Sequence, residues 1–146
     1  MDEQSYLSQL NAIDREIAEY EQNLKRFRTE REEADEARRS MGRMREKLDE
    51  FVERRRARLL SFDRSNSACC FSSFFTQADT LLNGAPHQRA QERIDDAAST
   101  LSGSIRRLDG DIDYCGRELA RLRAAREDLY SAYRTMLARQ AANNAT

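Results

Sequence analysis

The sequence predicts an all-α protein, a long antiparallel helical hairpin of the coiled-coil type with a short amphipathic helix near its bend. Three observations support this fold class. Apolar residues recur at alternating steps of three and four between Ala98 and Met136, and a second heptad pattern runs through residues 2–62. Such a repeat is typical of a helix that buries a narrow seam against another helix. One Pro, five Gly and 35% charged residues are also typical of long helices.

The first predicted helix covers about residues 2–62 and keeps one heptad frame throughout. One seam position is occupied by Leu10, Ile17, Leu24, Arg31, Arg38, Arg45, Val52 and Leu59. The other is occupied by Ile13, Tyr20, Phe27, Ala34, Met41, Leu48, Arg55 and Phe62. Four arginines therefore fall in the seam, where a long side chain can lay its stem along the partner helix and keep its guanidinium in water.

A turn is predicted at residues 63–67, followed by a short amphipathic helix at about residues 67–82 with Ser67 as a candidate N-cap. The apolar residues of this short helix share one helical face: Phe71, Phe74, Phe75, Ala78, Leu81 and Leu82. Asn83 and Gly84 indicate a helix end, and Pro86 indicates a new helix that has the proline in its first turn.

The final predicted helix covers about residues 86–141, and only Arg126 interrupts its apolar repeat. The repeat consists of Ala98, Leu101, Ile105, Leu108, Ile112, Cys115, Leu119, Leu122, Leu129, Tyr133 and Met136. Two long helices joined by a short segment predict an antiparallel hairpin. We expect residues 1–146 to form a single domain of this kind.

The flanking charges favour one register, in which the numbers of facing residues sum to about 139. This register places Asp14 beside Arg123 and Arg28 beside Asp109, whereas a slip of one heptad brings Glu21 beside Asp109. Each exposed pair is worth only a few tenths of a kcal/mol, but several pairs together can decide between two otherwise equivalent registers.

The segment around the bend carries more apolar residues than a two-helix seam needs, among them Leu60 and Phe62. They fit either a small three-helix core or a surface that binds a partner. The residues assigned to the partner-binding interpretation are Met44, Phe51, Phe71, Phe74, Phe75, Leu81 and Leu82.

Several function classes have no support in the sequence. A formal net charge of −1 gives no overall attraction to nucleic acid or anionic lipid, and no stretch approaches the ~18–20 apolar residues of a membrane span. The run Arg54–Arg58 lies beside Glu50 and Glu53, which favours a solvated helix face. The only histidine, His87, is expected to be solvated or to cap a helix. We therefore predict a non-enzymatic protein without a metal site or a cofactor.

The cysteines and the first residues predict a cytoplasmic location. Cys69, Cys70 and Cys115 match neither a disulfide framework nor a zinc-binding spacing, so we expect three thiols in a reducing compartment. Cys115 occupies a seam position and is expected to be buried. The acidic start of the chain has no apolar region of the kind that Sec-type signal peptides require.

Tyr114 and Glu118 fit the spacing Tyr-x-x-x-Glu, which places them one turn apart on the same face of a helix. This spacing is also the export-signal pattern of type VII secretion substrates in Gram-positive bacteria. That signal usually follows the helical hairpin, whereas the match here lies inside the final helix. The pair is a candidate export motif for a Sec-independent route.

The layout resembles the small YwqH-like proteins found beside LXG-type toxins, which are relatives of the WXG helical hairpins. The resemblance consists of the start at residues 6–10, the long charged helix, the aromatic residues between Phe62 and Phe75, and the second long helix. It implies a helical partner protein that pairs with the toxin's N-terminal domain or a similar small helical protein. The Trp-x-Gly of the WXG proteins is absent, so Phe62 or Phe71 would replace its packing. The alternative function is a structural coiled coil that associates with copies of itself.

Overall fold

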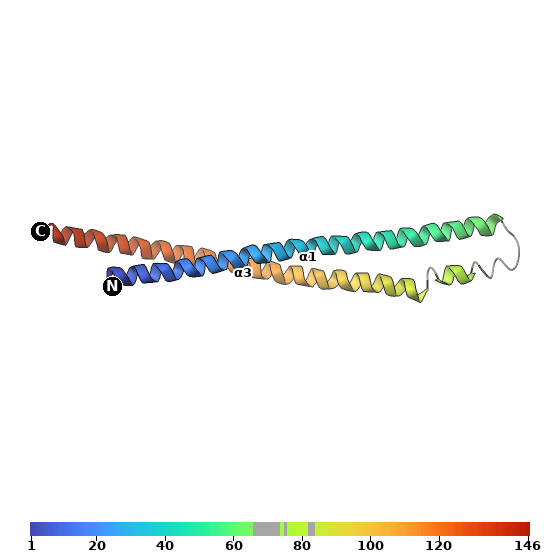
Figure 1. Ribbon diagram of the computed structural model, residues 1–146, viewed down its shortest axis with the longest axis horizontal. Coiled ribbons are helices and arrows are strands. Elements are labelled where there is room, and N and C mark those ends of the chain that lie inside the picture. Colours follow the sequence, from blue (N-terminus) through green and yellow to red (C-terminus); the bar gives the residue numbers. More distant parts are fainter. Residues whose placement is uncertain (66–73, 75, 82–83) are drawn as a thin grey trace. The chain divides into compact units, whose positions relative to one another are not determined.

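The computed structural model describes residues 1–65, 74, 76–81 and 84–146, with the side chains of residues 62–65 left aside. Two long helices, α1 (Glu3–Ser65) and α3 (Ala85–Asn144), account for most of these residues (Figure 1). No strand occurs in the described ranges. The predicted fold class, an all-α helical hairpin, is therefore confirmed. The predictions for Ser67, Cys69, Cys70, Phe71, Phe75 and Leu82 lie outside the described residues.

Helix α1 begins at a side-chain cap and ends later than predicted. The Asp2 carboxylate accepts a hydrogen bond from the Ser5 backbone N–H at 2.9 Å, which satisfies a donor of the first turn. At the other end the helix continues to Ser65, although residues 63–65 were assigned to a turn. Asp and Ser are only weakly unfavourable inside a helix, so they do not end one by themselves.

Gly84 marks the start of α3, where its carbonyl accepts a hydrogen bond from the Gln88 N–H at 3.1 Å. Pro86 then lies in the first turn, as predicted. A side chain at position 84 would collide with the carbonyl oxygen of Thr80, so the close approach of the backbone requires glycine here. Helix α3 continues to Asn144, beyond the predicted end at Ala141.

The chain divides into two compact units, each of which contains part of both long helices (Figure 1). Unit 1 consists of Met1–Arg31 and Arg106–Thr146, and unit 2 is Glu32–Ile105. In each unit the two helical parts run antiparallel (Figure 1). That the units together form a single domain over residues 1–146 stays a prediction.

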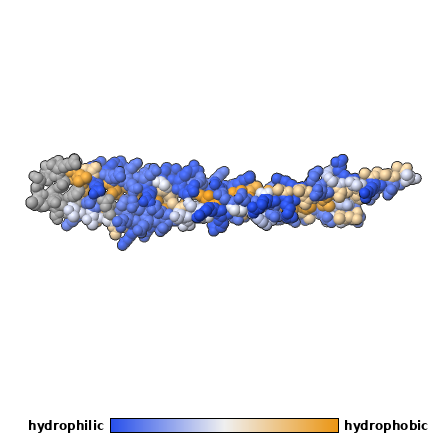
Figure 2. Space-filling model, turned by 180° about the vertical axis from the view of Figure 1, so that it is seen from behind, coloured by the Kyte–Doolittle hydropathy of each residue, from blue (hydrophilic) through white to orange (hydrophobic). Residues whose placement is uncertain are grey.

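The predicted seam of α3 is correct along its whole length, because each of its members is buried or half-buried. In unit 1 the most buried members, Cys115, Leu119 and Leu122, are each only 3% exposed, and Leu10 of α1 is also buried. Among the described residues of unit 2, Val52 and Ile105 are buried apolar residues. On the face that Figure 2 shows, hydrophilic side chains cover most of the surface and apolar ones form small patches among them.

Cross-helix contacts in unit 1 agree with the predicted register but not with the individual pairs. Arg126 donates to Asp14 at 2.5 Å, and Arg31 pairs with Asp109. The residue numbers sum to about 140 in both pairs, close to the predicted 139. The expected pairs Asp14–Arg123 and Arg28–Asp109 are wrong. Arginines that lie in the seam extend to its edge, where they reach the flanking carboxylates first.

Unit 2 shows the same behaviour of a seam arginine. Arg45 pairs with Asp95 on α3, and the Gln91 amide donates to Asp49 at 2.8 Å. The bond with Asp95 raises the pKa of the Arg45 guanidinium. Two of the four seam arginines, Arg31 and Arg45, thus bind carboxylates of the opposite helix.

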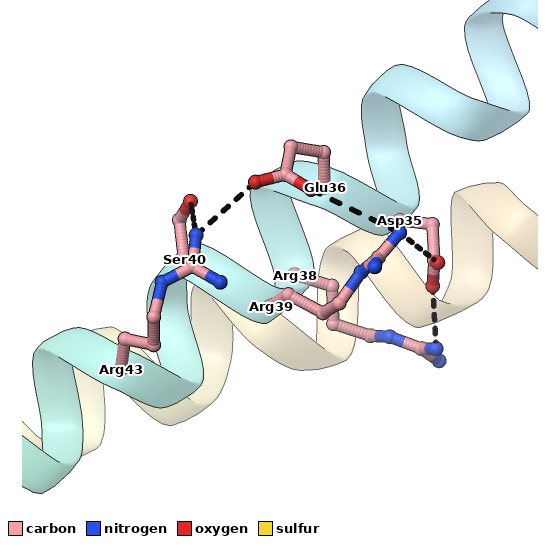
Figure 3. A network of polar contacts seen from close by, with 6 residues as sticks. All are labelled: Asp35, Glu36, Arg38, Arg39, Ser40 and Arg43. Atoms are coloured by element: carbon pink, nitrogen blue, oxygen red, sulfur yellow. Dashed lines mark hydrogen bonds and ion pairs between the residues drawn. The ribbon is translucent and has the colours of Figure 1, made fainter.

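The other two seam arginines, Arg38 and Arg55, are exposed, so the predicted seam of α1 is interrupted at both positions. Arg38 belongs to a polar network on the outside of α1 (Figure 3). In this network Asp35 accepts hydrogen bonds from Arg38 at 2.7 Å and from Arg39 at 3.0 Å. Arg43 donates to Glu36 at 3.1 Å and to Ser40 at 2.9 Å. Because both carboxylates lie on α1 itself, the network supports this helix and not its pairing with α3.

Candidate partner-binding site

Large apolar side chains of unit 2 are exposed where the sequence indicated either a core or a binding surface. Their exposed fractions range from 40% to 71%, and the residues are Met44, Phe51, Leu60, Phe74 and Leu81. A closed three-helix core is therefore the wrong interpretation for these five residues. Met44, Phe51, Phe74 and Leu81 are the described members of the predicted partner-binding set.

Three of these side chains line one apolar groove with a volume of about 600 Å³. Its lining consists of Phe51, Arg55, Arg58, Leu59, Phe74, Ala78 and Leu81. The α1 residues follow one another at helical spacing and so form a single face of that helix. Phe74, Ala78 and Leu81 have the spacing predicted for one face of the short helix, of which residues 74 and 76–81 are described as helical. The groove, defined by these seven residues, lies between these two faces.

An ion pair holds the second wall of the groove against the first. Arg56 of α1 lies 3.1 Å from the carboxylate of Asp79, which is next to the groove residue Ala78. Within the short helical segment, the Thr80 hydroxyl donates to the Thr76 carbonyl at 2.8 Å. Arg56 thus fixes the position of the wall without lining the groove itself.

The charged members among the described lining residues are two arginines, Arg55 and Arg58. The Arg55 guanidinium lies 5.3 Å from the ring centroid of Phe51, within the range of a cation–π contact. Among the described residues, no carboxylate forms an ion pair with Arg55 or Arg58. The nearby acidic residues Glu50 and Glu53 lie on a different face of α1, which they share with Arg54 and Ala57.

From the sequence, Phe51, Phe74 and Leu81 were assigned to a partner-binding surface, but the two arginines of the groove were not assigned to it. The run Arg54–Arg58 was interpreted as a solvated face, and Arg55 was placed in the seam. The signal that could have found them is their spacing, because Arg55 and Arg58 follow Phe51 by four and seven residues. Leu59, which was assigned to the seam alone, also lines the groove.

The candidate export motif lies in unit 1, where Tyr114 and Glu118 are one turn apart on α3, as the spacing predicted. Tyr114 is 50% exposed, and its ring centroid lies 6.3 Å from that of Tyr20 on α1. The Glu118 carboxylate accepts two hydrogen bonds from Arg121, at 3.0 and 2.7 Å. A side-chain hydrogen bond with Tyr114 raises the pKa of Tyr20. Both motif residues therefore have contacts inside unit 1.

His87 differs from its prediction as a solvated or capping residue. Its side chain is only 12% exposed, and its Nε2 lies 3.9 Å from a carboxylate oxygen of Asp49. The reason is that the 3-4 repeat of α3 extends backwards from Ala98 through Ile94, Gln91 and His87, which turns His87 towards α1. In the described ranges no group of His, Cys, Asp and Glu side chains is arranged to hold a metal ion.

Within the same ranges, no helix is both long enough and apolar enough to cross a membrane. Cys115 is a buried free thiol in the seam, as predicted. The site assembled by the chain is thus an apolar groove with a basic rim, and the ion pair between Arg56 and Asp79 links its second wall, a short helical segment, to α1. Comparison of the chain with models of protein families, with curated proteins and with solved structures returned no match.

Proposed function

We propose that this chain is a non-enzymatic helical partner protein and that it binds a helical segment of another protein in the groove. The observation that carries the proposal is the exposure of Phe51, Phe74 and Leu81 around one apolar hollow. Contiguous exposed apolar surface rimmed by charge usually marks a binding site. Aromatic side chains in such a site carry a disproportionate share of the binding energy.

A helix is the occupant that the form of the groove favours. The two walls are themselves helical faces, and an amphipathic helix binds such a surface through apolar side chains one turn apart. Met44 lies one heptad before Phe51 on α1 and would extend the contact along the same face. Met suits a binding surface because its flexible side chain adapts to different partners.

The biological setting that we propose rests on the resemblance to YwqH-like proteins. The partner would be the helical N-terminal domain of an LXG-type toxin, which the chain would bind in the cytoplasm before export through type VII secretion. Tyr114 and Glu118 would act as the export motif if the chain itself accompanies the toxin. Because both residues have contacts in unit 1, recognition would require their side chains to leave Tyr20 and Arg121.

Co-purification with the proposed partner, the helical N-terminal domain of an LXG-type toxin, tests the proposed function. The double variant Phe51→Ser plus Phe74→Ser removes both aromatic members of the groove and should abolish co-purification while circular dichroism retains the helical signal. Leu7→Ser, at a 43% exposed position in unit 1, is the matched control and should bind normally. Full binding by a folded double variant would contradict the proposal.

Self-association is the second candidate function, and the heptad spacing of Met44 and Phe51 is the observation that favours it. Two copies could pair through such a stripe. Sedimentation equilibrium distinguishes the two functions. If the wild type is a dimer and the double variant at Phe51 and Phe74 is a monomer, the result would favour a structural coiled coil. If the wild type is a monomer, the result would favour binding of a different protein in the groove.

A further inference from the structure

We propose that the helix bound by the groove is acidic: its apolar side chain lies between Phe51, Phe74 and Leu81, and its flanking Asp or Glu residues pair with Arg55 and Arg58. This inference rests on the proposed function and specifies the chemistry of the partner. The occupant is a segment of a different protein, and not a second copy of this chain.

The charged side chains of α1 near the groove are segregated by face. Glu50 and Glu53 share a face with Arg54, whose guanidinium donates to the Glu50 carbonyl at 3.4 Å. Arg56 is paired with Asp79. Glu50, Glu53 and Asp79 therefore do not line the groove, and the two arginines that line it have no carboxylate partner in the described part of the chain.

The two groove arginines lie beside the apolar side chains of the groove. Arg55 lies over the Phe51 ring, so its guanidinium is held beside the apolar surface that a partner would cover. A partner helix that covers this surface also removes water from the guanidinium groups. Desolvated arginines without a carboxylate would oppose binding, whereas a carboxylate can form a paired, charge-assisted contact with the planar guanidinium.

A second copy of the chain is a poor occupant for the same reason. In a two-fold symmetric dimer the same patch meets itself, so a contact centred on the groove would bring Arg55 and Arg58 of one copy towards those of the other. Like charges brought together in this way oppose association. The basic rim thus favours a different protein that carries an acidic helix.

A phage-displayed library of helical peptides, randomised along one apolar face and at the flanking positions, provides the test. The full chain is the bait, and its Phe51→Ser plus Phe74→Ser variant removes peptides that bind elsewhere. We expect the surviving peptides to carry Asp or Glu beside the apolar anchor. Their affinity should fall about tenfold for Arg55→Glu plus Arg58→Glu, and raised salt should weaken it by screening.

Arg15→Glu plus Arg28→Glu is the matched control, since it makes the same charge change at exposed positions of unit 1. Peptide affinity should stay within about twofold for this control, because screening limits the reach of distant exposed charges. A peptide with Lys in place of its acidic residues should bind the Arg55→Glu plus Arg58→Glu variant better than wild type. If that variant is not folded, Arg55→Gln plus Arg58→Gln replaces it.

The outcomes separate this inference from the proposed function. Groove-dependent peptides without acidic residues, or with unchanged affinity for the glutamate variant, would overturn the acidic partner and leave the groove as a docking site. Failure to recover any groove-dependent peptide would overturn both. A dimer of the chain that is lost in the Phe51→Ser plus Phe74→Ser variant would assign the groove to a second copy and overturn the acidic partner.

Discussion

Leu119 is the residue at which the seam of α3 can be tested most simply. It is 3% exposed, so Leu119→Ala leaves a cavity and should lower the free energy of unfolding by about 2–5 kcal/mol. Urea unfolding followed by circular dichroism measures the change. Leu7→Ala, at a 43% exposed position, is the control and should cost far less. A loss below about 0.5 kcal/mol at Leu119 would show that this face is not buried.

Gly84 and Gly103, both in unit 2, should respond oppositely to alanine. A Cβ at position 84 meets the Thr80 carbonyl, whereas a Cβ at position 103 meets no atom within 4 Å. We expect Gly103→Ala to stabilise α3 by about 1 kcal/mol, since alanine is the better helix former. Gly84→Ala should destabilise the start of α3. Equal stabilisation by both substitutions, measured by thermal unfolding, would contradict the close approach at Gly84.

Tyr133 predicts how stability depends on alkaline pH. Burial and the hydrogen bond that its hydroxyl donates to Glu3 at 3.1 Å raise the pKa of Tyr133. The fold therefore favours the neutral phenol. Its contribution is complete below the unfolded pKa of about 10 and is lost as the pH rises through the higher folded pKa.

The unfolding temperature of the wild type should thus decrease as the pH rises above about 10, and that of Tyr133→Phe should decrease less steeply. Thermal unfolding at a series of pH values, followed by circular dichroism, checks this. Tyr130→Phe is the comparison, because Tyr130 is exposed and this variant leaves the hydrogen bond between Tyr133 and Glu3 in place. Parallel pH curves for the wild type and Tyr133→Phe would contradict the assigned role of the Glu3 contact.

At the scale of the helices, the antiparallel register can be tested by a disulfide in unit 1. The predicted register sets Leu24 of α1 opposite the native Cys115 of α3, so Leu24→Cys should crosslink within one chain on oxidation. Cys69 and Cys70 are replaced by serine to remove competing thiols. Ile17→Cys, one heptad away, is the comparison. More efficient crosslinking from position 17 than from position 24 would refute the register.

The helices and their seams could be predicted because burial repeats at every turn. Leu119 and Leu122 belong to a long series of apolar residues at steps of three and four, and this series can still be recognised although Arg126 interrupts it. The end of α1 at Ser65 was harder to predict. Residues with high and with low helix propensity differ by only fractions of a kcal/mol, so the propensities of the last few residues do not determine where the helix ends. The individual ion pairs were missed because arginine reaches several carboxylates from one backbone position.

The candidate site was predictable in part for a similar reason. Phe74, Ala78 and Leu81 have the sequence spacing of one helical face, and Phe51 is a large apolar residue outside the two seam positions of α1. The sequence does not show which face of α1 the short segment opposes, and in the structure Asp79 of this segment pairs with Arg56 of α1. Arg55 and Arg58 become groove residues only once this choice is known.

At the scale of the whole molecule, the net charge of −1 conceals local differences that matter for binding. Carboxylates of α3, including Asp95 and Asp109, are used in pairs with seam arginines. The groove instead combines an apolar floor with arginines that lack carboxylate partners among the described residues. Stability and binding thus depend on different arginines, so the two properties should be separable by mutation.

The central claim is that a helical partner occupies the groove, and hydrogen–deuterium exchange tests it most directly. The full chain is compared alone and with the proposed partner, the helical N-terminal domain of an LXG-type toxin. The account predicts that binding protects the amides of residues 51–59 and 76–81, while the Phe51→Ser plus Phe74→Ser variant shows no such protection. Protection confined to Met1–Arg31 and Arg106–Thr146 would contradict the claim and place the partner on unit 1.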